Sequence, residues 1–207
     1  MFNALIKTKE RVLIYKNLCH SCNACVKICP ERALTMKQSR IGEVHIMETK
    51  FKIPFIEGIL DLKEEMSTSL IVRTKKIAEE KFSNYDLHIY DSPPGTSCSY
   101  MESIKDANIV IIITEPTPFG MSDSAIAIEV AKNLRKKIAV VINRGSDDDR
   151  EVVQFFNDLN VNVIAQIRNN RKIAEVYSIG ERVLGVNSNF DNAIEKIADY
   201  IIKERKL

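Results

Sequence analysis

The 207-residue sequence lacks the features that would assign it at once to several broad functional classes. Thirty lysines and arginines against twenty-eight aspartates and glutamates leave a formal net charge of +2, so nothing in the charge balance favours nucleic acid. No apolar run reaches the roughly 18–20 residues of a membrane-spanning helix. Residues 1–7 do not have the shape of a signal peptide. We therefore expect a cytoplasmic protein that binds neither nucleic acid nor membranes.

Glycine is also scarce, and the residue that follows each glycine is informative. The sequence has seven glycines, and none of them is followed by lysine. A Walker A loop needs the pattern G-x-x-x-x-G-K-[ST], because backbone N–H groups surround the phosphates and the lysine neutralises them. The sequence therefore contains no such loop.

Cysteine is concentrated in one place. Four of the five cysteines follow the spacing C-x2-C-x2-C-x3-C with proline next, which is the ligand run of bacterial-type ferredoxins. Structural zinc usually uses two separated knuckles, and disulfides within so tight a run would be strained. Cys19, Cys22, Cys25 and Cys29 are therefore predicted to bind a [4Fe-4S] cluster.

The ligand count of this run does not balance. In two-cluster ferredoxins the first three cysteines of a run bind one cluster and the fourth binds the other. The only further cysteine is Cys98, which is either a ligand or a small buried hydrophobic residue. His20, between two ligands, either donates a hydrogen bond to sulfur or is simply exposed.

A short internal repeat bears on the missing ligands. Ala33-Leu34 aligns with Ala4-Leu5 at an offset of twenty-nine residues, which places the counterpart of Cys29 just before Met1. We therefore expect residues 1–42 to be part of a two-cluster ferredoxin-like domain in a chain that begins in its middle.

The remainder of the chain, 43–207, alternates strands and helices. This order predicts an incomplete, mostly parallel, doubly wound α/β sheet. The predicted elements are a strand pair within 43–62 around Pro54 or Gly58, strands at 87–90, 108–113, 137–142 and 161–165, and helices at 68–82, 122–135, 150–159, 171–178 and 189–203.

Distinctive sequences follow the predicted strands, where ligands bind in open α/β sheets. An apolar strand ending in Asp91 has the form of a Walker B segment, whose carboxylate reaches Mg²⁺, and Gly95 would let the next loop approach a phosphate. Asn143 ends another strand and could read a base edge by amide hydrogen bonds. Ordinary strand-end turns would also explain these residues.

Four motifs taken together resemble the MinD-type P-loop ATPases that carry an inserted ferredoxin domain. They are Asp91–Thr96, Thr114–Gly120, Val141–Arg144 and Ile173–Glu181, and they occur in the family's order. The resemblance implies a P-loop NTPase-like fold, ATP and Mg²⁺ as ligands of the intact family, and a role in iron–sulfur or metal-cofactor maturation or electron transfer. It also implies a redox or cofactor-assembly protein as partner, and a homodimer.

The resemblance assigns roles to individual residues. Asp91 would be the magnesium-side carboxylate, Gly95 would belong to the switch loop, and Asn143 would contact adenine. The four clustered cysteines would be the second of the family's two ligand runs. The family's Walker A loop and first ligand run are both missing, and one truncation before Met1 would explain both.

Without the phosphate-binding loop, the stabilisation of phosphoryl transfer is lost. We therefore expect the chain not to hydrolyse ATP by itself. A non-enzymatic electron carrier or cluster scaffold is the alternative function, and a split protein with its P-loop on a separate chain is a further alternative.

Overall fold

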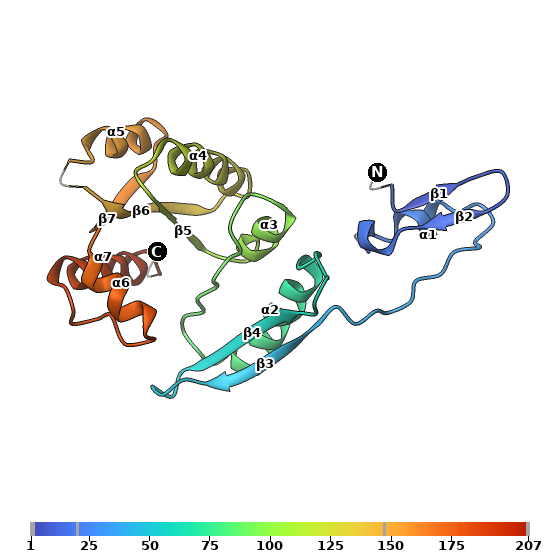
Figure 1. Cartoon of the computed structure of the whole chain (residues 1–207), viewed down its shortest axis with the longest axis horizontal. Coiled ribbons are helices and arrows are strands. Elements are labelled where there is room, and N and C mark those ends of the chain that lie inside the picture. The colour runs from blue at the N-terminus through green and yellow to red at the C-terminus, as the bar shows by residue number, and fades with distance from the viewer. Residues whose placement is uncertain (1–2, 20, 147, 206–207) are drawn as a thin grey trace. The chain divides into compact units, whose positions relative to one another are not determined.

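The computed structural model describes residues 3–19, 21–146 and 148–205 of the chain (Figure 1). The chain divides into two compact units, Met1–Ile89 and Tyr90–Leu207, and each is described by itself. The expected domain boundary at residue 42 stays a prediction.

The unit Tyr90–Leu207 is built on a parallel sheet of three strands in the order β5-β6-β7. These strands are β5 (Ile109–Thr114), β6 (Lys137–Gly145) and β7 (Asn162–Arg168). Four consecutive residues of β6, from Ala139 to Ile142, have no exposed surface, which means that both faces of the strand are covered. Such burial explains why the central strand reads as a continuous apolar run.

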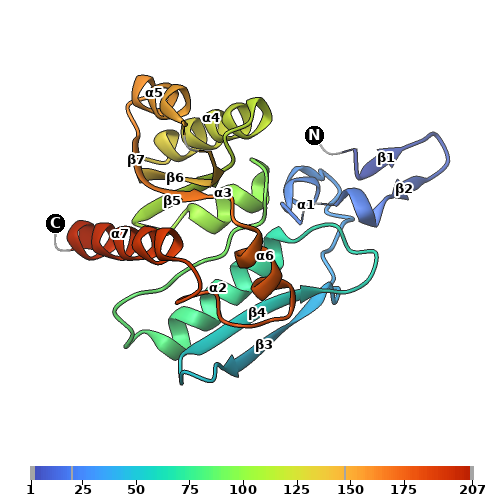
Figure 2. The ribbon, with the colours of Figure 1, turned by 60° about the vertical axis from the view of Figure 1, so that its left-hand side comes forward.

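Helices cover both faces of this sheet. Side chains of α3 (Cys98–Ile104), α4 (Pro118–Asn133) and α5 (Arg150–Asp158) form one buried cluster with β5 and β6. On the opposite face, α7 (Ser188–Arg205) packs on β6 and β7 (Figure 2). The sheet is therefore doubly wound, as the sequence predicts.

Most predicted elements of this unit occur within a few residues of their expected bounds. The helix α6 (Arg171–Ser178) agrees at both ends. The helix α4 begins four residues earlier than expected, because Pro118 occupies its first turn and the Thr117 hydroxyl accepts the Gly120 N–H at 3.0 Å. The helix α3 was not predicted.

The strand predicted at residues 87–90 is wrong. These residues have no regular secondary structure, and the side chains of Leu87 and Ile89 are 50% and 81% exposed. A strand exists only where a neighbour completes its ladder of hydrogen bonds. Within the described residues the sheet consists of β5, β6 and β7 alone, and residues 87–90 pair with none of these strands.

The unit Met1–Ile89 contains a hairpin of β3 (Gly42–Glu48) and β4 (Pro54–Leu60), and α2 (Thr68–Phe82) packs against it. The strand pair and α2 are confirmed, but the turn lies at residues 49–53, directly before Pro54, and the alternative turn at Gly58 is wrong. Gly58 lies within β4, where a Cβ would come within 2.9 Å of the Leu70 side chain. Its missing side chain lets the helix approach the strand.

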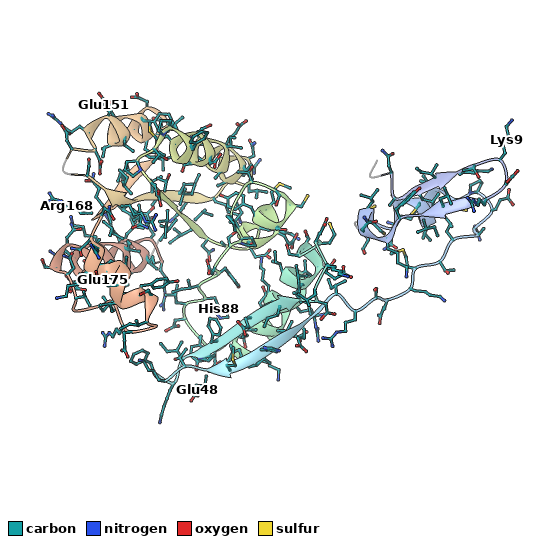
Figure 3. All side chains as sticks on the ribbon, viewed as in Figure 1. Lys9, Glu48, His88, Glu151, Arg168 and Glu175 are labelled. Carbon is teal, nitrogen blue, oxygen red and sulfur yellow. The ribbon has the colours of Figure 1, made fainter. Side chains whose placement is uncertain are left out.

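The cysteine run lies in a small segment with two short antiparallel strands, β1 (Leu5–Lys7) and β2 (Val12–Ile14). Lys9 is at the tip of this hairpin (Figure 3). A short 3-10 turn, η1 (Lys16–Leu18), and the helix α1 (Ala24–Ile28) follow. No described residue between 3 and 37 is buried. None of the helices in the described parts of the chain is both long and apolar enough to cross a membrane.

Candidate functional site

The backbone of the cysteine run turns sharply between its first three thiols. Ser21 and Asn23 both adopt left-handed conformations, with φ of 51° and 59°, although neither is glycine. Cys22 lies between these two residues, and Cys25 follows inside α1. Left-handed residues reverse the local direction of the chain, so this segment curls as a cluster-binding loop must.

Cys29 differs from the other three cysteines. It ends α1 in an extended conformation, and its Sγ accepts the backbone N–H of Ala33 at 3.4 Å. A hydrogen bond of this kind stabilises negative charge on sulfur and tunes an iron–sulfur centre. Cys22 is exposed and the other three of the run are half-buried, so all four are within reach of a bound group.

The donor set fits an iron–sulfur cluster. Soft thiolates favour iron–sulfur clusters, zinc and copper(I), and four of them at this spacing match a cubane. Among the described residues, no three His, Cys, Asp or Glu side chains are grouped as an assembled metal site. His20 lies outside the described residues.

Cys98 is exposed at the start of α3, so the alternative of a small buried hydrophobic residue is wrong. It belongs to the unit Tyr90–Leu207, whereas the cysteine run belongs to Met1–Ile89. Its role as a ligand stays untested.

A second candidate site lies at the carboxyl ends of β5 and β6. Glu115 directly follows β5 and pairs with Arg144 of β6 at 3.1 Å, with both side chains about half exposed or more. Arg144 is left-handed with φ of 54°, and the pairing of β6 with β7 is irregular between Ile142 and Gly145. Irregularities of this kind are common next to ligand sites, where they redirect side chains. Asn143 lies within this irregular stretch and is half-buried.

The loop after β6 is fixed by Asp149, which is only 7% exposed. Its carboxylate accepts the Ser146 N–H at 3.1 Å and the Ser146 hydroxyl at 2.7 Å. A Cβ on Gly145 would overlap this carboxylate, so the loop needs glycine there. Sequence reasoning missed Asp149 and the Glu115–Arg144 pair. The signal that could have found Asp149 is an aspartate directly before a predicted helix.

Asp91 and Gly95 lie in a stretch without regular secondary structure at the start of the same unit. Asp91 is exposed, and Gly95 has a φ of +89°, which favours glycine. Asp91, Gly95 and Asn143 therefore belong to one compact unit, and their roles toward Mg²⁺, phosphate and adenine stay predictions.

A shallow cleft of about 410 Å³ lies between the start of β3 and α2 in the unit Met1–Ile89. Its lining includes Arg40, whose guanidinium forms a two-pronged contact with Asp61 at 2.9 and 3.1 Å. Hydrogen bonding to Arg40 lowers the pKa of the Asp61 carboxyl. Arg40 precedes β3 and Asp61 follows β4, so this contact joins the end of the hairpin that is opposite its turn. None of the predicted site residues lines the cleft.

Comparison with known proteins decides the nature of the cysteine segment. Residues 12–35 match the family of 4Fe-4S binding domains. Over 200 residues the chain is 32% identical to the uncharacterized protein MJ0579 of Methanocaldococcus jannaschii, covering 96% of this chain and 68% of the relative. The chain belongs to the family of this relative. The uncharacterized protein MJ0578 of the same organism is 30% identical over 100 residues, covering 48% of this chain and 36% of that protein.

Solved structures define the fold. The cell division ATPase MinD of Pyrococcus furiosus superposes with a TM-score of 0.62 at 20% identity, covering 76% of this chain and 69% of that one. The MinD cell division protein of Aquifex aeolicus gives 0.61 at 17% identity, covering 76% and 68%. The chain therefore combines a 4Fe-4S binding segment with an incomplete MinD-type α/β fold. The resemblance and the fold class predicted from the sequence are confirmed.

Proposed function

We propose that the chain is a cytoplasmic iron–sulfur protein that transfers electrons or supports the maturation of iron–sulfur or metal cofactors, without hydrolysing ATP by itself. The observation that supports this most is the coincidence of the four-cysteine run with the 4Fe-4S domain match and with a curled, exposed backbone. The partner of this function is a redox or cofactor-assembly protein.

Different residues of the cysteine run would have different roles in holding a cluster. Four thiolates supply the ligands, and the left-handed Ser21 and Asn23 turn the chain so that successive thiolates face inward. The Ala33 N–H donates to Cys29 and lowers the energy of a charged sulfur. When bound, a [4Fe-4S] cluster supplies one-electron redox chemistry.

The charge of this segment suits the same role. Residues 3–37 contain seven lysines and arginines and only two glutamates. A cubane held by four thiolates is negatively charged overall, so the surrounding cations lower the cost of carrying that charge. The same cations would attract an acidic face of a redox partner.

The proposed lack of ATP hydrolysis rests on the absence of a Walker A loop and its lysine from these 207 residues. The MinD-type fold supports a nucleotide site at the strand ends, where Asn143 lies, but no glycine of the sequence is followed by lysine. In P-loop enzymes, backbone donors and this lysine stabilise the transferring phosphoryl group. Without these groups the α/β fold can still bind a protein partner, but it is not expected to hydrolyse ATP.

The proposal is tested by anaerobic reconstitution with iron and sulfide. We expect the protein to gain broad visible absorption and, after reduction, the electron paramagnetic resonance signal of a [4Fe-4S] cluster. Cys22→Ser should lose most of this iron, whereas Cys98→Ser should retain it, because Cys98 lies outside the matched domain. Equal iron in wild type and Cys22→Ser would show that the run does not hold the cluster.

A further inference from the structure

The strand β3 has a free edge. Within the described residues its sheet consists of β3 and β4 alone, so β3 has a neighbouring strand on one side only. Across the hairpin the Ile41 carbonyl accepts one backbone N–H and the Thr49 N–H donates to another carbonyl, both at 2.9 Å. Paired residues alternate along an antiparallel ladder, so Val44 and Ile46 direct their N–H and C=O groups away from β4.

This edge carries few of the features by which proteins protect an exposed strand. Those features are lysine, proline, bulges and short length. The strand β3 has seven residues in unbroken register with β4, and none of the seven is lysine or proline. Its two glutamates, Glu43 and Glu48, lie near its ends. The middle of β3 is therefore open to hydrogen bonding with the main chain of another segment.

The cleft of about 410 Å³ lies beside this strand, where the start of β3 faces α2. The β3 wall includes Val44, whose cross-strand partner Gly58 approaches Leu70, so the Val44 side chain lies on the helix-facing side of the sheet. The helix wall includes Leu70, Arg73 and Ile77, which follow one another at one-turn spacing on one face of α2. A strand added to β3 would direct every second side chain to this side.

Arg73 determines which charge a bound segment should carry. The other two charged residues of the lining are already paired, because Arg40 contacts Glu43 at 3.4 Å and Asp61 at 2.9 Å. The Arg73 side chain is exposed, and it forms no ion pair with any residue that the structure describes. A guanidinium beside an apolar cleft favours a carboxylate in the molecule that binds there.

We propose that the β3 edge and the cleft bind an extended segment of a partner protein as a third strand, with apolar side chains in the cleft and an acidic side chain at Arg73. Main-chain hydrogen bonds to β3 supply the affinity, and the cleft and Arg73 supply the specificity. The site lies outside the cysteine run and does not depend on a bound cluster.

The first test measures amide hydrogen exchange of the full chain by nuclear magnetic resonance under nitrogen. In the free protein the amides of Val44 and Ile46 should exchange faster than those of His45 and Met47, which face β4. The probe is a short synthetic peptide that alternates valine with threonine and carries one glutamate. It should slow exchange at Val44 and Ile46 about twofold when half of the protein is bound. The same peptide with every backbone nitrogen methylated should have no effect.

The second test is a double-mutant cycle between Arg73 and the glutamate of the peptide. Replacing that glutamate by glutamine should weaken binding about two- to fivefold in the wild type and leave binding to Arg73→Gln unchanged. Lys76→Gln is the matched control, because Lys76 is an exposed cation of the same helix that pairs with Glu80 and does not line the cleft. This control should show the wild-type loss. Circular dichroism checks that both variants are folded.

Four results would overturn the proposal. Slow exchange of Val44 and Ile46 in the free protein at every concentration would mean that this chain covers its own edge. Protection that appears only as the protein concentration rises, together with a dimer by light scattering, would assign the edge to a second copy. No protection by the peptide at its highest soluble concentration would show that no strand is added. An equal effect of the peptide glutamate in wild type and Arg73→Gln would remove Arg73 from the site.

Discussion

Single residues carry most of the functional signal, because the spacing of the cysteines alone predicts their chemistry. The left-handed conformations of Ser21 and Asn23 could not be predicted in the same way, since neither residue type requires positive φ. The exposure of Cys98 was equally out of reach, because burial depends on elements that meet only in the folded chain. Asp149, the buried acid that fixes the loop after β6, left one signal in the sequence, an aspartate directly before a predicted helix.

Replacing Asp149 should destabilise the α/β unit. The Asp149→Ala variant leaves the Ser146 N–H and hydroxyl without their buried acceptor, and we expect a loss of about 1–3 kcal/mol in the free energy of unfolding. Asp148→Ala is the matched control, because that carboxylate is exposed and pairs with Arg150 at the surface. Urea unfolding followed by circular dichroism measures both, and equal stabilities would disprove the anchoring role.

The contact between Arg40 and Asp61 makes a pH-dependent prediction. Arg40 lowers the pKa of Asp61 by hydrogen bonding, so the contact stabilises the hairpin above about pH 4 and is lost as the pH falls through the lowered pKa. Arg40→Gln should raise the pKa of Asp61 toward its ordinary value in a nuclear magnetic resonance titration. Arg150→Gln should instead raise the pKa of Asp148 and leave Asp61 unchanged.

At the scale of elements, the sequence predicts the buried strands and every helix of eight or more residues, but it misses the seven-residue α3 and the short β1 and β2 and places a strand at residues 87–90 that does not form. Continuous apolar runs predict β5 and β6. The helices α2 and α6 begin and end at the residues predicted from the sequence. Residues 87–90 have the same apolar character and form no strand, because a strand depends on a neighbour that its own sequence does not specify. The short β1 and β2 carry too few residues for any periodic pattern.

Two neighbouring residues of β5 should respond differently to truncation. Ile112 is 9% exposed and packs in the cluster with α4, whereas its neighbour Ile113 is 65% exposed. We expect Ile112→Ala to cost about 2–4 kcal/mol and Ile113→Ala less than about 1 kcal/mol. Chemical denaturation of the two variants decides the point, and equal losses would mean that the Ile113 side chain is buried as well.

At the scale of the whole molecule, the chain pairs a basic iron–sulfur segment with a MinD-type α/β fold. The fold class could be predicted from the order of strands and helices, because parallel sheets require alternating elements. The division between Ile89 and Tyr90 could not, since compactness depends on which elements pack together and not on composition.

Nucleotide binding by the whole chain should be weak. Each charge-assisted hydrogen bond to a phosphate contributes about 1.5–3 kcal/mol, and several of these are lost without a Walker A loop. We expect a Kd for Mg-ATP no better than about 1 mM and no measurable ATPase activity. Calorimetric titration is the measurement, and Asp148→Ala is the control for Asp91→Ala, because both replace an exposed aspartate. Micromolar binding abolished by Asp91→Ala would reveal another phosphate-binding element in this chain.

The account depends above all on a cubane held by the cysteine run. Mössbauer spectroscopy of protein loaded anaerobically with ⁵⁷Fe and sulfide, alongside iron, sulfide and zinc analysis, tests this most directly. The account predicts equal amounts of iron and sulfide, the spectrum of a [4Fe-4S] cluster, and its loss in Cys22→Ser but not in Cys98→Ser. A mononuclear iron site without sulfide, or retention of zinc in place of iron, would contradict it.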